Sequence, residues 1–201
     1  VVTRGVGLEP RLEPRGCTPT VAIIVGPWLH LVDPKQERGM KVRTSTWRRI
    51  PPECLDPRIK SLNYLNIILA RMDATAAGAD DGLMLDLRGC VSEGPGYNVF
   101  AARDGVLSTP RDNILEGITR QTIFEICARE GIPVEVRDLW LYDLYTADEV
   151  FFCSSSVAVV GVVELDGRRI GAGAPGPLTR RLYDLFMREL TEGDDLTVVF
   201  P

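Results

Sequence analysis

The feature that most limits the fold is VFFCSSSVAVVGVV, residues 150–163, which is the longest apolar run of the 201-residue chain. Three serines interrupt the run, and it is shorter than the roughly 20 apolar residues that a membrane-spanning helix needs. Valine and phenylalanine dominate its two halves, which is typical of buried strands. We therefore expect a sheet whose strands are buried in the core, and no membrane segment.

Strand-like and helical segments alternate along the rest of the chain. Segments rich in β-branched residues predict strands at Thr20–Pro27 and Gly39–Trp47, and the pair Asp104-Gly105 predicts a hairpin turn. A Pro-rich break, IPPECLDP, precedes a helix that is expected from about Lys60 to Ala77. Further helices are expected over Thr119–Gly131 and from Pro177 to about Glu189. This mixture predicts an α/β to α+β fold with a mixed sheet.

Composition excludes several classes of function. The net charge of −5 and the scattered arginines leave no basic stripe for a nucleic acid. Five cysteines, odd in number and without CxxC spacing, are typical of reduced thiols in a cytoplasmic protein. The only histidine is His30, so we expect no metal site.

One lysine is unusual in this background. The chain holds twenty arginines and only three lysines, and Lys60 stands in RIKSLNYLNIILAR where a helix is expected to begin. A lysine amine can lose its proton and attack a carbonyl carbon, whereas arginine keeps its charge. Lys60 is therefore a candidate for covalent chemistry, although a solvated surface lysine is the ordinary alternative.

Three other segments carry groups that could act with Lys60. Glu93 lies in a Gly-rich loop, SEGPGYN, and the serines 154–156 end a buried strand. Gly117 to Thr119 begin a helix whose free N–H groups could bind a phosphate, with Thr119 also serving as an N-cap. An amine, a carboxylate for a ring nitrogen and a phosphate cradle are what a pyridoxal phosphate enzyme requires.

The order of the motifs extends this hypothesis. KSLNYLN, EGPGYNVF, DGVLSTP, LEGITR, ADEVFF and LDGRRIGAGAPGPLTRRL follow one another along the chain. Together they resemble the class IV aminotransferases of fold type IV, pyridoxal phosphate enzymes that include the branched-chain aminotransferases. The resemblance extends from about Val2 to Leu182 and implies pyridoxal 5′-phosphate as the cofactor.

The resemblance assigns roles to individual residues. Lys60 matches the lysine that forms the Schiff base and carries the proton, and Glu93 matches the partner of the pyridine nitrogen. Tyr64 matches a tyrosine at the ring's phenolic oxygen. Ile118 and Thr119 match phosphate-binding residues.

The same resemblance assigns residues at the other end of the site. Ser155 stands where the family has a phosphate-binding Thr, and Ser154 is expected to help it. Arg4, in TRG, and Ser156 are expected on the substrate side. The segment from Val157 onward departs from the family, which has small residues and a Pro there, so the pocket wall is expected to differ.

The resemblance also implies a domain organisation. Residues 1–50 are expected to be the end of a smaller N-terminal α/β domain, residues 51–58 an interdomain linker, and residues 59–201 the C-terminal cofactor-binding domain. The chain begins VVTRGVG, without Met. We expect a preceding segment, corresponding to most of the family's N-terminal domain, to be missing.

The predicted reaction is transamination between an amino acid and a 2-keto acid in a homodimer. Tyr64 favours a branched-chain substrate. A D-amino-acid aminotransferase is disfavoured because Glu13 follows Arg11 where that group has a histidine that binds a carboxylate. The alternatives are a D-amino-acid or (R)-amine transaminase, an aminodeoxychorismate lyase-like enzyme, and an inactive paralogue that only binds the cofactor.

Overall fold

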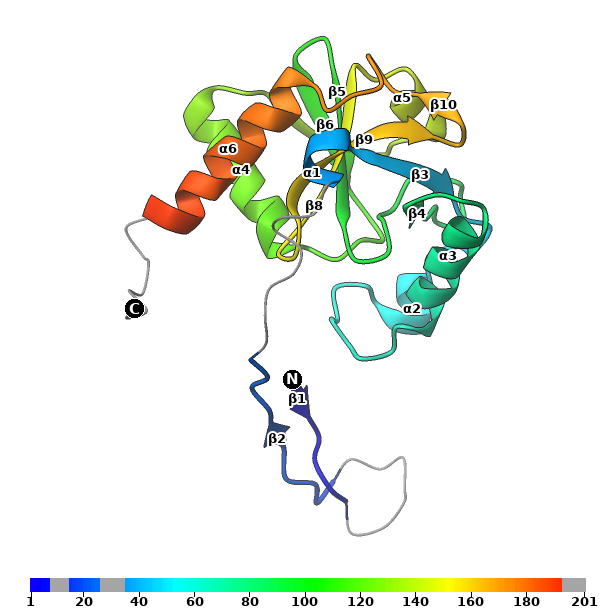
Figure 1. Cartoon of the computed structure of the whole chain (residues 1–201). Helices are drawn as coiled ribbons and strands as arrows, with labels where there is room; N and C mark the ends of the chain where they lie inside the picture. Colours follow the sequence, from blue (N-terminus) through cyan, green and yellow to red (C-terminus); the bar gives the residue numbers. More distant parts are fainter. Residues whose placement is uncertain (8–14, 26–34, 193–201) are drawn as a thin grey trace.

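The computed structural model describes residues 1–7, 15–25 and 35–192 (Figure 1). Its main element is an eight-stranded sheet in the order β4-β3-β9-β8-β5-β6-β7, with β10 paired to β9. The strands are β3 (Met40–Thr44), β4 (Asp81–Leu83), β5 (Asn98–Arg103), β6 (Val106–Pro110), β7 (Val134–Arg137), β8 (Glu149–Ser154), β9 (Ala158–Leu165) and β10 (Arg168–Arg169). A separate two-stranded sheet joins β1 (Val2–Thr3) to β2 (Thr20–Val21).

The large sheet is mixed, as the sequence predicts. Strand β3 runs parallel to β4 and β9, and β6 runs parallel to β7. The pairs β5–β6, β5–β8 and β8–β9 are antiparallel. The apolar run at 150–163 forms β8 and β9, and its serines form the turn between them. The prediction of two buried strands is confirmed.

Neighbouring residues of the central strands serve opposite faces of the sheet. Phe151 belongs to a cluster with Ile123 of α4 and Phe186 of α6. The next residue, Phe152, belongs to a second cluster on the other face, with Val42 and Leu144. Side chains alternate in this way because successive residues of a strand point to opposite faces. Both faces of β8 are thus buried, which explains the apolar stretch Val150–Cys153 at the centre of this strand.

Helices and loops cover the sheet (Figure 1). Helices α4 and α6 lie side by side on one face, and α3 lies near β3 and β4. The helices are α1 (Lys35–Arg38), α2 (Pro52–Leu55), α3 (Leu65–Ala76), α4 (Ile118–Glu130), α5 (Leu141–Tyr145) and α6 (Pro177–Glu192). The predicted hairpin turn is confirmed, because Asp104 and Gly105 both have positive φ, 51° and 79°.

Two predicted element boundaries are wrong. Lys60 does not begin a helix, since α3 starts at Leu65. Between them the backbone forms tight turns, in which Ser61 N donates to Ile59 O and Tyr64 N donates to Leu62 O. The predicted strand at Thr20–Pro27 ends at Val21, where its pairing with β1 ends, and its last two residues lie outside the described part.

The N-cap of α4 also differs from the expectation. Gly117 is the N-cap, with extended φ and ψ of −69° and 140°, and Thr119 is the second residue of the helix. Thr119 therefore lies inside the first turn of the helix, and the prediction that it is the N-cap is wrong. The division of the chain into domains stays a prediction. One strand from the range 1–50, β3, pairs with β4 and β9 and so belongs to the large sheet.

Candidate functional site

A cavity of about 500 Å³ opens between four segments that are distant in sequence. The first is the chain before α3, residues 55–64, and the second is the loop around Glu93. The N-terminus of α4 and the serine turn between β8 and β9 complete the lining. Strands β5 and β8 are antiparallel neighbours in the middle of the sheet, so the start of β5 and the end of β8 lie side by side next to the cavity.

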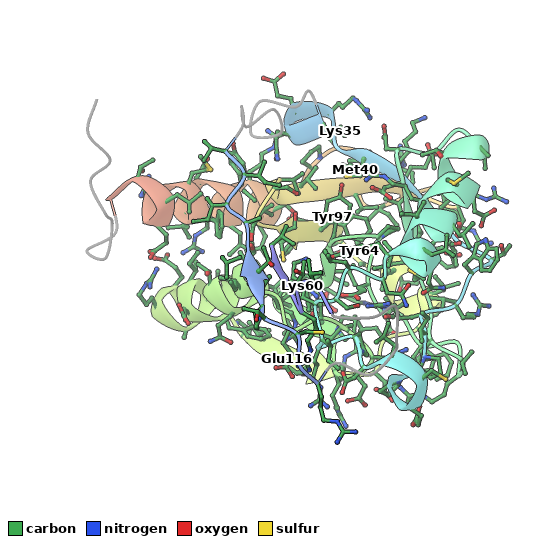
Figure 2. The ribbon with its side chains drawn as sticks, turned by 90° about the horizontal axis from the view of Figure 1, so that it is seen from below. Lys35, Met40, Lys60, Tyr64, Tyr97 and Glu116 are labelled. Atoms are coloured by element: carbon green, nitrogen blue, oxygen red, sulfur yellow. The ribbon has the colours of Figure 1, made fainter. Side chains whose placement is uncertain are left out.

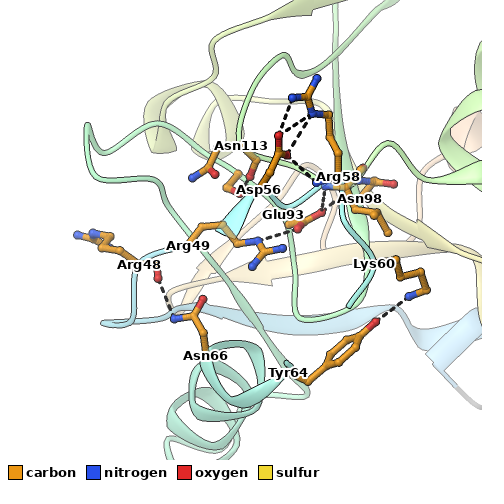
Figure 3. Close-up of polar contacts among 12 residues, drawn as sticks. Arg48, Arg49, Asp56, Arg58, Lys60, Tyr64, Asn66, Glu93, Asn98 and Asn113 are labelled. Atoms are coloured by element: carbon orange, nitrogen blue, oxygen red, sulfur yellow. Dashed lines mark hydrogen bonds and ion pairs between the residues drawn. The ribbon is translucent and has the colours of Figure 1, made fainter. Parts of the chain in front are cut away.

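Lys60 and Tyr64 form one wall of the cavity (Figure 3). Lys60 Nζ donates a hydrogen bond of 2.7 Å to the Tyr64 hydroxyl. Both residues precede α3, so the backbone turns of this segment, and not the helix, place the two side chains next to each other. Lys60 is exposed, and its amine is therefore accessible from the cavity.

Glu93 forms the buried end of the cavity, and it is only 5% exposed. Its Oε1 accepts a hydrogen bond of 2.9 Å from Arg49 Nε, and Oε2 accepts one of 3.0 Å from Leu115 N (Figure 3). Asn98 Nδ2 lies 3.4 Å from Oε2. Burial raises the pKa of the Glu93 carboxyl, and the charge of Arg49 counteracts this effect. Arg49 therefore favours the carboxylate form that a protonated ring nitrogen would need.

The N-terminus of α4 lies beside this carboxylate. The N–H groups of a helix's first turn have no carbonyl partner within the helix, and the helix dipole favours an anion there. Gly117 permits a close approach at this point, because a Cβ on it would lie 2.2 Å from Asn98 Oδ1. Ile118 is exposed and Thr119 is buried, and both line the cavity.

The serine turn supplies hydroxyl groups. Ser154 Oγ and Ser156 Oγ are 2.9 Å apart, and Ser156 N donates to Ser154 Oγ at 3.4 Å. Ser154, Ser155 and Ser156 all line the cavity. This turn and the start of α4 together offer hydroxyl and N–H donors, which suit a phosphate or a carboxylate.

The structure brings most of the predicted site residues together. The cavity is lined by Lys60, Tyr64, Glu93, Ile118, Thr119, Ser154, Ser155 and Ser156. Arg4 follows β1 and is not part of this lining. Arg11, Glu13 and His30 lie outside the described residues. The roles of all these residues stay predictions.

Sequence reasoning missed two residues that hold the site in place. Arg49 and Asn98 both contact Glu93, and both are buried. Asn98 stands in the motif EGPGYNVF and could have been found from it. Arg49 carries no such signal, because it is one of twenty arginines and its partner is 44 residues away.

The groups in the cavity fit the predicted cofactor. The lining combines an amine, a buried carboxylate and a helix N-terminus within about 500 Å³, which is within the usual size range of a small-molecule site. In the described part of the chain, no three or more His, Cys, Asp or Glu side chains are grouped so that they could hold a metal ion. None of its helices has both the length and the apolar character that crossing a membrane requires.

Comparison with known proteins identifies the family. The model of the family Amino-transferase class IV matches residues 1–165. The chain belongs to the class IV aminotransferases. The family predicted from the sequence motifs is thus confirmed.

Several relatives of this class IV aminotransferase are branched-chain aminotransferases by name. The chain is 43% identical over 189 residues to the "Putative branched-chain-amino-acid aminotransferase" of Methanocaldococcus jannaschii, covering 92% of this chain and 64% of that protein. The crystal structure of the Escherichia coli branched-chain amino acid aminotransferase superposes with a TM-score of 0.86 and 34% identity, covering 95% and 64% of the two chains.

A third relative is the branched-chain amino acid aminotransferase of Thermobaculum terrenum, crystallised in its PLP-form. Its TM-score is 0.76 at 36% identity, and the match covers 80% of this chain and 53% of that one. The predicted fold is confirmed by these structures. The chain spans 64% of the length of the first two of these relatives and 53% of the third.

Proposed function

We propose that this class IV aminotransferase catalyses pyridoxal phosphate-dependent transamination between an amino acid and a 2-keto acid. The observation that carries the proposal is the grouping of Lys60, the buried Glu93 and the N-terminus of α4 around one cavity. The names of the relatives support the same reaction. Pyridoxal phosphate, when bound, supplies an electron sink for the electron pair that remains after the α-proton of an amino acid is removed.

Lys60 would hold the cofactor and move the proton. Its Nζ is the amine that would hold the cofactor through its aldehyde carbon, and the same amine would take the α-proton of the substrate and return it. The Tyr64 hydroxyl, 2.7 Å from Nζ, orients the amine between these steps. Glu93 would hold the protonated ring nitrogen, with Arg49 and Leu115 N fixing its carboxylate.

The remaining polar groups would hold the phosphate and the substrate. Ile118 and Thr119 contribute backbone N–H groups and a hydroxyl at the N-terminus of α4. Ser154 and Ser155 face the same cavity and would add hydroxyl donors. Ser156 is proposed for the substrate carboxylate, and Arg4 remains a proposal based on the family resemblance.

The proposed substrates are branched-chain amino acids, because the relatives carry that name. The alternatives are D-amino acids or (R)-amines, or a lyase reaction of the aminodeoxychorismate type. A homodimer follows from the resemblance to the family. A cytoplasmic location is proposed from the five cysteines without CxxC spacing.

The test is to trap the cofactor on its lysine. The purified chain is incubated with pyridoxal phosphate, reduced with borohydride and mapped by peptide mass. The cofactor mass is expected on the peptide containing Lys60, and Lys60→Arg should abolish it. Lys41→Arg is the matched control, because Lys41 is an exposed lysine that pairs with Glu164 at 3.3 Å. Stoichiometric labelling that survives in Lys60→Arg would overturn the assignment.

The substrate class is tested on the unreduced protein, incubated with pyridoxal phosphate. L-leucine, D-alanine and an (R)-amine are offered separately, and the keto product is measured by mass spectrometry. Faster conversion of L-leucine supports the branched-chain proposal. Labelling on Lys60 without conversion of any donor would support the alternative of an inactive cofactor-binding paralogue.

A further inference from the structure

A second, smaller cavity lies next to the candidate site. Its volume is about 140 Å³, and two residues, Tyr97 and Ser156, line both cavities. Figure 2 shows Tyr97 between Lys60, which lines the larger cavity, and Met40, which lines the smaller one. Tyr97 has by far the larger side chain of the two shared residues, so its ring forms most of the wall between the cavities.

The ring of Tyr97 is held on its face. It stacks on Phe152 of β8 with a centroid distance of 5.3 Å and an interplanar angle of 1°. The backbone of Tyr97 closes a tight turn with Gly94, in which Gly94 N donates to Tyr97 O at 2.9 Å. A Cβ on Gly94 would lie 3.1 Å from Tyr97 Cδ2, so glycine leaves room for the ring in this position.

The hydroxyl end of Tyr97 is held as well. Asp81 of β4 is fully buried, and its Oδ2 lies 2.9 Å from Arg71 Nη2 of α3. Burial and the negative charge of Asp81 raise the pKa of Tyr97 to about 12. The phenol is therefore neutral at physiological pH and remains beside this ion pair. The stacking on Phe152 and the turn with Gly94 hold the ring in place, so Tyr97 forms a wall in this structure.

The smaller cavity could accept an apolar chain if the wall were removed. Met40, Val157 and Val160 provide its apolar lining, while Lys35, Gln36 and Arg71 line it with polar groups. Met40 and Val160 are each 2% exposed, so this part of the lining belongs to the packed interior, whereas Val157 is half-buried. A ligand that reached past Tyr97 would bury additional methylene groups there, and each one adds affinity.

We propose that Tyr97 is a specificity-determining residue, which limits the length of the substrate chain by closing the larger cavity against the smaller one. The inference rests on the proposed function in one respect, namely that the larger cavity is where the amino acid and keto acid bind. The limit then follows from the position of the ring. Substrates with short branched chains fit in front of Tyr97, and longer chains meet its face.

The test measures binding, independently of turnover. Straight-chain carboxylic acids from butanoate to decanoate are titrated by calorimetry into the full chain with saturating pyridoxal phosphate. This probe is chosen because a related branched-chain amino acid aminotransferase was crystallised in complex with 4-methylvaleric acid. In the unaltered protein the affinity should rise roughly fourfold with each methylene and then stop rising. In Tyr97→Ala the rise should continue for at least two further carbons.

Two further variants separate the wall from other effects. Tyr97→Phe keeps the ring and removes the hydroxyl, so the limiting length should be unchanged. Val157→Phe, combined with Tyr97→Ala, fills part of the smaller cavity with a larger side chain and should restore the original limit. If Tyr97→Ala does not fold, Tyr97→Leu replaces it, because leucine keeps an apolar contact with Phe152.

The outcomes distinguish this inference from the proposed function. An equal limiting length in the unaltered protein and in Tyr97→Ala, or in the leucine variant, overturns the inference. So does an affinity that does not depend on chain length in any of the proteins. A limit that moves as expected while borohydride leaves Lys60 unlabelled would support the wall and reject the proposed cofactor chemistry.

Discussion

Arg49 Nε lies 2.9 Å from Glu93 Oε1, and the two side chains are only 9% and 7% exposed. This ion pair links the segment between β3 and α2 to the Gly-rich loop at the deep end of the candidate site (Figure 3). The pair has a second effect, because Leu115 N donates to the other carboxylate oxygen and thereby ties the approach to α4 to the same residue. Glu93 thus holds these segments of the chain together and is also a candidate cofactor ligand.

Arg49→Met should destabilise the fold strongly. It leaves the buried carboxylate of Glu93 without its cation, which typically costs about 3–5 kcal/mol. The double variant Arg49→Met/Glu93→Gln removes both charges and should be less destabilised than the sum of the two single variants. Urea denaturation followed by circular dichroism measures all three.

Arg58→Met is the matched control for this ion pair. Arg58 pairs with Asp56 at 2.5 Å, but its side chain is 64% exposed. Exposed ion pairs contribute little to stability, so this variant should change the unfolding free energy much less than Arg49→Met does. Equal losses of unfolding free energy in Arg49→Met and Arg58→Met would show that the buried Arg49–Glu93 pair stabilises the fold no more than the exposed pair does.

Tyr64→Phe should slow transamination and leave the trapping of the cofactor on Lys60 intact. The variant removes only the hydroxyl that accepts the 2.7 Å hydrogen bond from Lys60 Nζ. A typical hydrogen bond is worth about 0.5–1.5 kcal/mol, which corresponds to a loss of roughly twofold to tenfold in kcat/KM. Stopped-flow measurement of the half-reaction with L-leucine tests this. An unchanged rate would remove Tyr64 from the proposed site.

Gly117→Ala should weaken cofactor binding. The new Cβ would lie 2.2 Å from Asn98 Oδ1, and Asn98 Nδ2 also donates to Leu115 O at 2.8 Å. The start of α4 must therefore shift, and alanine is a poorer N-cap than glycine. We expect the Kd for pyridoxal phosphate to rise about tenfold, which corresponds to roughly 1.4 kcal/mol. An unchanged Kd would place the phosphate away from this helix.

Elements with local signals at both ends were predicted well. Helix α4 was expected over Thr119–Gly131 and is found over Ile118–Glu130, with Gly131 in the left-handed region at φ 66°. A glycine in that conformation ends a helix, so residue type alone is informative. The start of α3 was placed five residues too early, because the turns between Lys60 and Leu65 depend on backbone hydrogen bonds that no residue type specifies.

In the candidate site too, residues with a local sequence signal were predicted, and residues placed by long-range contacts were not. Lys60 and Glu93 were found because each stands in a recognisable motif. Arg49 was missed, and so was the role of Tyr97 within the motif EGPGYNVF, because both depend on folding. Arg49 meets a carboxylate 44 residues away, and Tyr97 becomes a wall only where β5 and β8 bring it against Phe152. Contacts of this range depend on the sheet topology, which short sequence patterns do not report.

Two adjacent aspartates predict a specific acid dependence of stability. Arg38 binds both oxygens of Asp80, at 2.7 and 2.8 Å, and lowers the pKa of that carboxyl, whereas burial raises the pKa of Asp81. As the pH falls, the carboxyl of Asp80 is protonated in the unfolded chain near its ordinary pKa of 3.8. In the folded protein the same carboxyl is protonated only at a lower pH. The stabilisation from Asp80 is therefore present above that pH and is lost as the pH falls through its folded-state pKa.

Asp80→Asn tests this dependence directly. The unfolding free energies of the unaltered protein and the variant should differ most near neutral pH, and the difference should shrink as the pH falls below 3.8. Asp104→Asn is the control, since its side chain is 90% exposed and exposed ion pairs contribute little. Urea titrations between about pH 7 and pH 3 give both differences. A difference for Asp80→Asn that grows toward low pH would have the wrong sign for a carboxyl with a lowered pKa, and would mean that Arg38 does not stabilise the charged form.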